Sequence, residues 1–184
     1  MFKSSSYNQF FRECAIAHKA ILHNTAAEGN DGPSGECTFY IGIDKAINGV
    51  RKKIDASKLS LIALKYEAKG SDNGAFDYRG MYKGAFIICQ AADMSSTAAI
   101  ETAEDLTEET AWDIINLIIQ RQVSAASGLH CSSPFGEVSL SDFQISNVGP
   151  FLENHYGWMV EFDFKITRAE LISPDRLATQ FPSL

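Results

Sequence analysis

Residues 155–166, HYGWMVEFDFKI, carry the clearest structural signal in the chain. From Trp158 to Ile166 a large apolar residue occupies every second position. A period of two is typical of a strand with one buried face and one wet face. The stretch therefore predicts a strand of an antiparallel sheet that is covered on one side. The expected buried side is Trp158, Val160, Phe162, Phe164 and Ile166, and the expected wet side is Met159, Glu161, Asp163 and Lys165.

Two stretches upstream are expected to form a long antiparallel hairpin. The first strand runs from Leu59 to Tyr66 (LSLIALKY) and the second from Tyr78 to Ala91, with a polar tip at about 67–78. Alternation assigns the side chains to two faces in each strand. One face is expected to hold Ile62, Leu64 and Tyr66 in the first strand, and in the second strand Tyr82, Phe86 and Ile88 oppose Ala85, Ile87 and Cys89.

Two further strands complete the predicted sheet. A short one covers Cys37 to Ile43, after the loop Ala27 to Gly35 (AEGNDGPSG). The other covers Gly136 to Val148, and Ser141-Asp142 is expected to interrupt it with a bend or bulge.

A first helix is predicted from about Ser6 to His23. Ser4, Ser5 and Ser6 offer capping oxygens at its start. Apolar residues recur at spacings of three and four, which places them on one stripe. The stripe contains Tyr7, Phe10, Phe11, Cys14, Ala17, His18 and Ile21.

A second helix is predicted after residues 92–106, which are interpreted as a connection of small and acidic residues. Thr107 is the expected N-cap, with Glu108 and Glu109 in the first turn, where the helix dipole favours negative charge. Ser127-Gly128 is expected to end the helix. Its predicted apolar face is Ala111, Trp112, Ile115, Ile118, Ile119 and Val123.

The order helix, strands, helix, strands predicts an α+β fold. The economical arrangement is an antiparallel sheet with both helices packed on one face and the hairpin as an arm. The chain has no internal repeat and no long linker, so residues 1–184 are predicted to form a single domain. Its core would span about 5–167, followed by an irregular tail at about 169–184.

The composition is that of a globular protein with an acidic surface. The chain has 184 residues, 45% of them hydrophobic, and a formal net charge of −7. Neutralising phosphates requires clustered Lys and Arg, so this balance argues against sequence-specific nucleic-acid binding. The run Arg51-Lys52-Lys53 is interpreted as solvated surface. No signal-peptide core or membrane-length apolar stretch is found, so a cytoplasmic location without a membrane partner is expected.

The cysteines and histidines give no strong metal or disulfide pattern. Cys14, Cys37, Cys89 and Cys131 are scattered without a CxxC pair, and all four are predicted to be reduced. His18 and His23 lie five residues apart, so they do not form the i, i+4 pair of helical zinc sites. A metal site built from His130, Cys131 and His155 is conceivable, but surface or packed side chains are the favoured interpretation.

Signatures of catalysis are also lacking in the sequence. It contains no GxSxG elbow and no GxxxxGK[ST] loop, and Gly29 to Gly35 is interpreted as a plain loop. The carboxylates of Glu101, Glu104, Asp105, Glu108 and Glu109 are explained by helix capping and solubility rather than by acid–base catalysis. The prediction is a structural protein, not an enzyme, with no catalytic residue, cofactor or metal.

Taken in order, these elements resemble the tail-terminator (minor tail protein U) family and its relatives in phages and contractile injection systems. The likeness lies in the N-terminal helix, the strand LSLIALKY, the hairpin into YKGAFIICQA, the helix TEETAWDIINLIIQRQV and the final aromatic strand. HYGWMVEFDFKI is the most similar part, because such proteins often end in a Gly- and Trp-containing alternating strand. The resemblance covers most of residues 5–167 and assigns no functional residue.

The resemblance implies a subunit that closes the end of a tail tube as a ring, usually a hexamer. Strand edges and the hairpin arm would pair with neighbouring subunits, and one face of the ring would dock on the tail tube. Neck or sheath proteins would contact the long loop and the C-terminal tail. Such a protein lies in the cytoplasm during assembly and then in the virion or injection-particle tail.

Two alternatives remain open at this point. One is another head–tail connector or tube-like subunit, since these share small α+β sheets. The other belongs to a different class, a small-molecule-binding or enzymatic α+β domain whose aromatic sheet face lines a pocket.

Overall fold

The computed structural model describes residues 4–28, 38–42, 58–64, 66–72, 78–126, 135–152 and 154–166. These ranges contain two α-helices, two short 3-10 helices and six strands, which confirms the predicted α+β class. The helices are α1 (Ser4–Ala17), η1 (Thr25–Glu28), α3 (Thr97–Ala126) and η2 (Leu140–Asp142). The strands are β1 (Phe39–Ile41), β2 (Ser60–Ala63), β3 (Glu67–Asp72), β4 (Tyr78–Ala91), β5 (Phe143–Phe151) and β6 (His155–Ile166).

The six described strands form one mixed sheet. Its order is β1-β2-β4-β6-β5, and β3 also pairs with β4. The longest ladder joins β4 to β6, from Gly80 opposite Ile166 to Ala91 opposite His155. The prediction of a purely antiparallel sheet is wrong, because β1 and β2 are parallel. Parallel neighbours need a connection of about a dozen residues or more, and residues 42–59 supply enough chain for it.

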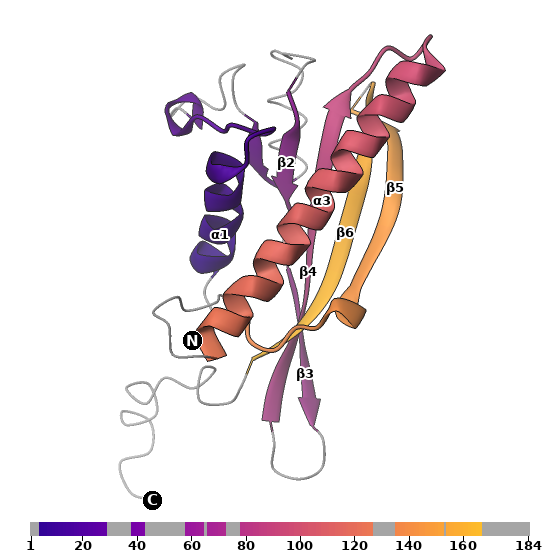
Figure 1. The fold of residues 1–184 in the computed structure, drawn as a ribbon. Helices are drawn as coiled ribbons and strands as arrows, with labels where there is room; N and C mark the ends of the chain where they lie inside the picture. Colours follow the sequence, from indigo (N-terminus) through magenta and orange to yellow (C-terminus); the bar gives the residue numbers. More distant parts are fainter. Residues whose placement is uncertain are drawn as a thin grey trace, which may run out of the picture.

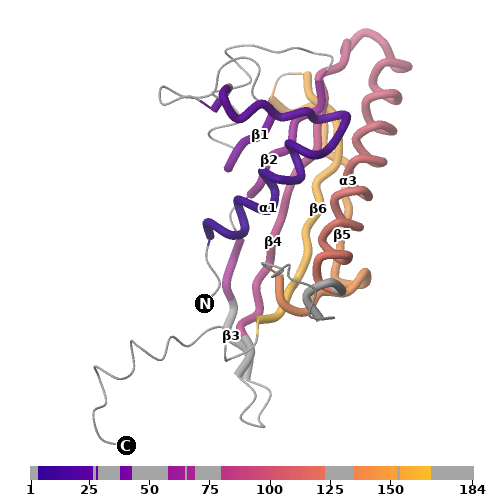
Figure 2. The backbone as a smooth tube through the Cα atoms, turned by 60° about the vertical axis from the view of Figure 1, so that its left-hand side comes forward, coloured from indigo at the N-terminus to yellow at the C-terminus, as the bar shows by residue number. Residues whose placement is uncertain are grey.

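Both helices pack on one face of the sheet, as predicted. Helix α3 crosses the sheet diagonally, and α1 lies beside it on the same side (Figures 1 and 2). The core between the layers is rich in aromatic rings, and Phe135 contacts the rings of Phe10 and Phe162 with centroids 4.9 and 5.4 Å away. The fully buried core side chains include Phe11, Phe86, Ile88, Ala111, Ile114, Ile115, Ile118 and Val160.

The face of the sheet opposite the helices is exposed at one end and buried at the other. On β6, Asp163 and Lys165 are exposed, so the wet face predicted from the alternation is confirmed there. At the β2 end, however, Ile62 and Cys89 are 0% exposed and form a second apolar cluster with Tyr40. The expectation of a sheet covered on one side is therefore wrong at this end. The sequence of β2, SLIA, is apolar on both faces, which is typical of a strand buried on two sides.

A separate hairpin arm is not shown among the described residues. The stretch Glu67–Asp72, which was expected in the polar tip, forms β3 and pairs with β4. Between β2 and β3 the register shifts by one residue: Ala63 lies opposite Phe86, whereas Glu67 lies opposite Lys83. A one-residue shift moves the following side chains to the other face. This explains why Tyr66 packs on the helical side while Ile62 and Leu64 join the opposite cluster, which contradicts their predicted common face.

Helix α3 begins at Thr97, ten residues before its predicted start. Ser96 caps it, because the Ser96 Oγ accepts a hydrogen bond of 3.2 Å from the Ala99 N–H. Thr107 is buried within the helix, where its Oγ1 donates to the Ala103 carbonyl at 2.6 Å, so its prediction as N-cap is wrong. The prediction of a connection over 92–106 is wrong from Thr97 onwards, because TAAIETAEDL consists mainly of good helix formers.

Helix α1 is confirmed, but it ends at Ala17 rather than at His23. The His18 N–H still donates to the Cys14 carbonyl at 2.9 Å, and the chain then turns. Leu22 has a φ of 48°, in the left-handed region that is incompatible with a continuing helix. Ile21 nevertheless remains fully buried in the core.

The strand predicted from Gly136 begins only at Phe143. The predicted bend at Ser141-Asp142 is confirmed, since these residues form η2. The Asp142 carboxylate accepts hydrogen bonds from the Ser139 N–H at 2.7 Å and from the Ser139 Oγ at 2.8 Å, which holds the turn. At the other end of β5 the Gly149–Pro150 peptide bond is cis.

Several sequence predictions fall outside the described residues. They concern the loop 29–35, the basic run 51–53, the helix end at 127–128 and the tail 169–184. Cys37 and Ile43, the predicted ends of the first strand, also lie outside them. Within the described part of the chain, no helix is long and apolar enough to cross a membrane.

Candidate functional site

The histidines considered for metal binding lie in separate places. The His18 Nε2 is 3.2 Å from an Asp113 carboxylate oxygen at the surface, between α1 and α3. His23 is buried, and its Nε2 lies 2.8 Å from a Glu28 carboxylate oxygen. His155 is 3% exposed, with its Nδ1 3.1 Å from the Leu152 carbonyl oxygen. Each of these rings is held by a local partner in the fold.

The conceivable metal site of His130, Cys131 and His155 falls partly outside the described residues, because 130 and 131 are not among them. Across the described ranges, no group of three or more His, Cys, Asp or Glu side chains is placed to hold a metal ion. Cys14 and Cys89, two of the four cysteines predicted to be reduced, are buried free thiols.

The acidic cluster of α3 lies inside the helix rather than at its N-terminus. Glu104 contacts the sheet, since its Oε1 accepts a hydrogen bond of 3.0 Å from the Asn147 Nδ2 on β5. Glu101, Asp105 and Glu109 are exposed. The capping role predicted for Glu108 and Glu109 is therefore wrong, since the helix begins three turns earlier.

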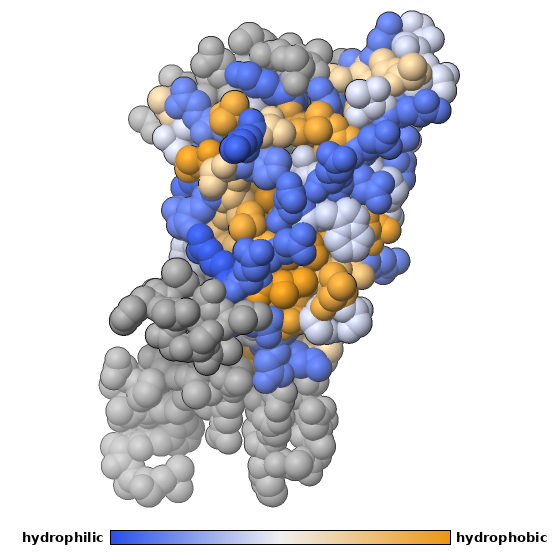
Figure 3. Space-filling view, in the orientation of Figure 1, coloured by the Kyte–Doolittle hydropathy of each residue, from blue (hydrophilic) through white to orange (hydrophobic). Residues whose placement is uncertain are grey.

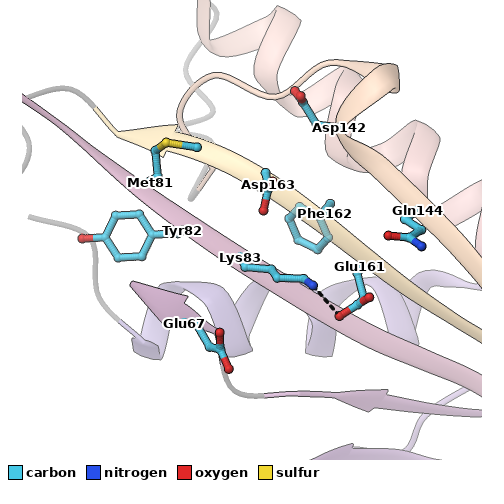
Figure 4. A pocket seen from close by; sticks show the side chains of 9 residues that line it. All are labelled: Glu67, Met81, Tyr82, Lys83, Asp142, Gln144, Glu161, Phe162 and Asp163. Carbon is cyan, nitrogen blue, oxygen red and sulfur yellow. Dashed lines mark ion pairs between the residues drawn. The ribbon is translucent and has the colours of Figure 1, made fainter. Parts of the chain in front are cut away.

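A hollow of about 270 Å³ lies beside β4 and β6 at the polar end of the sheet (Figure 4). Lys83 and Glu161 form an ion pair of 2.8 Å at its centre. The hydrogen bond to Glu161 raises the pKa of the Lys83 ammonium. A lysine that remains protonated is a poor nucleophile, so the arrangement favours charge pairing over catalysis. The lining consists of Glu67, Met81, Tyr82, Lys83, Asp142, Gln144, Glu161, Phe162 and Asp163.

The outer edge of β5 is the stronger candidate for a functional surface. One side of β5 pairs with β6, and no other described strand pairs with it. Its sequence, FQISNVGPF, contains no charged residue, although charged residues make up 21% of the chain. Natural proteins usually protect an edge strand with charges, Pro or a bulge. On β5 these features occur only at the end, with Pro150 and a register irregularity between Val148 and Phe151.

The other described edges of the sheet are better protected. In the described part of the chain, strand β1 has only three residues, and β3 begins with the exposed, charged Glu67. Short edge strands and charged edge residues both discourage pairing with another chain. Among the described strands, residues 143–148 of β5 therefore stand out as the open edge of the sheet.

Several large apolar side chains of the described residues are exposed. Leu140, at the start of η2 and three residues before β5, is 57% exposed. Trp112 is 40% exposed on α3, so its prediction as part of the buried face is wrong, whereas Ala111, Ile115 and Ile118 are fully buried as predicted. Hydrophobic surface also emerges between the polar side chains on the helical side of the molecule (Figure 3). The sequence alone does not predict that β5 is an edge strand, because strand order depends on pairing between segments that are distant in the chain.

The described fold is that of a two-layer α+β protein with a mixed sheet. Comparisons with protein-family models, curated proteins and solved structures found no match.

Proposed function

We propose that the protein is a structural subunit of a phage or phage-like tail, a tail-completion protein that forms a ring on the tail tube. The observation that supports this proposal best is the uncharged outer edge of β5, with which no other described strand pairs. An edge strand of this kind is a ready template for pairing with another chain. In the proposed ring each subunit offers its β5 edge to a neighbour.

A ring requires a heterologous contact, in which two different surfaces of the subunit meet. The β5 edge would supply one of these surfaces to one neighbour, and a different part of the chain would reach the other neighbour. The ring closes when a whole number of rotations from one subunit to the next makes one full turn. We propose six subunits, with the tail tube and neck or sheath proteins as further partners.

The proposed role is non-enzymatic and needs no cofactor or metal. The protein would be in the cytoplasm during assembly and in the tail of the virion or injection particle afterwards. Another head–tail connector or tube-like subunit would use the same open edge, but it would add subunits along an axis or join a differently sized ring. The hollow at Lys83 gives the small-molecule alternative no support, because it is lined mainly by charged side chains rather than by the apolar groups typical of ligand pockets.

The proposal is tested by the mass of the purified protein in solution at several concentrations, measured by light scattering after size exclusion. We expect a stable mass near six times the 20.2 kDa of one chain. A strict monomer at every concentration contradicts a self-assembling ring. A mass that grows continuously with concentration favours the tube-like alternative.

The edge itself is tested with a charged double variant, Gln144→Lys/Asn147→Lys. Both positions are exposed on β5, and lysines on an edge strand discourage pairing. The expected result is loss of the large species with an unchanged circular dichroism spectrum. Asn116→Lys, at an exposed position of α3, is the control for a change of charge and should leave the mass unchanged.

A further inference from the structure

We infer that the open edge of β5 receives residues 177–181 (LATQF) of a neighbouring copy as an added strand. The inference rests on the proposed function, since it names the segment that joins one subunit to the next. It commits to one occupant of the edge, a segment of the same chain that lies outside the described residues.

The receiving stretch runs from Phe143 to Val148. These six residues precede the irregularity between Val148 and Phe151, so their ladder with β6 is regular. Every second residue of an edge strand directs its N–H and C=O groups away from its partner strand. The stretch therefore offers regular main-chain hydrogen-bonding groups over six residues.

The register with β6 decides what an added strand would meet on each face. Phe143 and Ile145 lie opposite Phe162 and Val160, whose side chains belong to the core beneath the helices. Gln144, Ser146 and Val148 consequently lie on the reverse face. An added strand would meet Phe143, Ile145 and Asn147 on the helical face. On the reverse face it would meet Gln144, Ser146 and Val148.

Helix α3 borders the helical side of this edge. The hydrogen bond from Asn147 to Glu104 brings the N-terminal third of α3 within reach of β5. Glu108 and Trp112 follow Glu104 by one and two turns on about the same side of the helix. The indole of Trp112 is 40% exposed. Strand addition of this kind takes its affinity from main-chain bonds and its specificity from alternate side chains.

Residues 177–181 match the receiving stretch in length and pattern. Leu177, Thr179 and Phe181 alternate with Ala178 and Gln180, and the segment has no charge. Pro174 and Pro182 flank it, and Pro cannot donate to a ladder, so pairing would be confined between them. Five residues fit within the six of the open edge. Leu177 and Phe181 would face the helical side, and Ala178 and Gln180 would face Ser146.

The chain between β6 and this segment is long enough to reach a second copy. Ten residues, 167–176, separate Ile166 from Leu177. Ten extended residues span at most about 33–36 Å, which exceeds the length of the receiving strand. Strand β6 ends four residues beyond Phe162, the partner of Phe143, so the connection starts beyond the end of the open edge.

Site-specific cross-linking between two full-length chains tests the inference. One chain carries Ser146→Cys and one affinity tag, and the other carries Ala178→Cys or Gln180→Cys and a different tag. After mixing and mild oxidation, we expect a disulfide that joins the two tags. Thr179→Cys is the matched control, because its side chain would lie on the opposite face. The yield of its cross-link with Ser146→Cys should be at least fivefold lower. A mixture of the two tagged chains without introduced cysteines gives the background from the native cysteines.

The outcomes separate this inference from the proposed function. A ring by light scattering with no cross-link above background overturns the inference and leaves the ring. A cross-link that forms only within one chain carrying both cysteines also overturns it, because the segment then covers its own edge. Equal cross-linking at 178 and 179 overturns the added strand. If no oligomer forms at all, the proposed function fails together with the inference.

Discussion

The Trp158 indole N–H on β6 donates a hydrogen bond of 3.0 Å to the main-chain carbonyl of Glu104 on α3. The bond joins the N-terminal third of α3 to the sheet. The same carbonyl accepts a bond of 2.9 Å from the Thr107 hydroxyl. Main-chain carbonyls have two lone pairs, so a mid-helix carbonyl can accept from outside the helix. The bond therefore adds a fixed polar contact to the side-chain packing between α3 and β6.

Replacing Trp158 by Phe is expected to lower the free energy of unfolding by about 1–2 kcal/mol, since it removes one hydrogen bond and part of a packed ring. Urea unfolding followed by circular dichroism measures the change. Trp112→Phe is the matched control, because its side chain is 40% exposed. It should change stability by less than about 0.5 kcal/mol. Equal losses in the two variants would contradict a role for the Trp158 bond.

Gly84 is required by the ring of Phe162. A Cβ at position 84 would lie 2.6 Å from the Phe162 Cζ, closer than any carbon contact permits. We expect Gly84→Ala to destabilise the fold by about 1–3 kcal/mol, the usual cost of overpacking a core. The loss of unfolding free energy caused by Gly84→Ala should be smaller in a Phe162→Leu background, because Leu leaves room for the added methyl group. A double-mutant cycle in urea should give a coupling of at least about 1 kcal/mol, and additive losses would disprove the steric explanation.

The Tyr7 hydroxyl bridges both main-chain groups of Ala85. It donates to the Ala85 carbonyl at 3.1 Å and accepts from the Ala85 N–H at 3.0 Å. Tyr7→Phe leaves these groups without the hydroxyl, and a lost partner for a buried N–H costs about 1–3 kcal/mol. Urea unfolding at pH 7 measures this loss. No loss would mean that water replaces the hydroxyl at this position.

Because the Tyr7 side chain is buried, we also expect the stability of the fold to depend on pH. Burial raises the pKa of the Tyr7 phenol above its usual value, by more than the Ala85 hydrogen bond lowers it. In the unfolded chain a tyrosine ionises near pH 10, so the unfolded state loses the proton first. The stability advantage over Tyr7→Phe is therefore complete below about pH 10 and falls at higher pH, by up to about 1.4 kcal/mol per pH unit. A difference in unfolding free energy between the parent protein and Tyr7→Phe that stays constant from pH 9 to 11 would contradict this pH dependence.

Sequence periodicity was sufficient to predict the helices and the longest strands, because these elements follow local patterns. The β6 alternation and the α1 stripe both depend on neighbours one to four residues apart. The start of α3 was misplaced because Glu and Ala were interpreted as linker residues, although both favour helix. The face of Tyr66 was misassigned because a one-residue register shift is set by pairing with β4, which lies elsewhere in the chain.

The candidate surface could not be predicted in the same way. FQISNVGPF looks like any half-buried strand until its position in the sheet is known. Whether its lack of charge has a functional meaning depends on whether β5 is central or at an edge, which is a property of the whole topology. Trp112 was misassigned for a related reason. It lies beside Ala111 in sequence, but the helix turns it away from the core by about 100°.

The two buried thiols give a last prediction, on chemical reactivity. Burial raises the pKa of both the Cys14 and the Cys89 thiol to about 12. The thiolate is the reactive form, and at pH 8 a thiol with such a pKa is ionised to only about one part in ten thousand. In a Cys37→Ser/Cys131→Ser background, which leaves only these two, the native protein should react very slowly with a thiol reagent.

Labelling kinetics at several urea concentrations check this expectation. Both thiols should become reactive together at the unfolding transition, because Cys14 on α1 and Cys89 on β4 lie in layers of the same fold. Two labels per chain are expected beyond the transition. Earlier labelling of Cys14 than of Cys89 would show that α1 separates from the sheet before the sheet unfolds, which contradicts a single cooperative unit. Fast labelling of both at pH 8 without urea would contradict their burial.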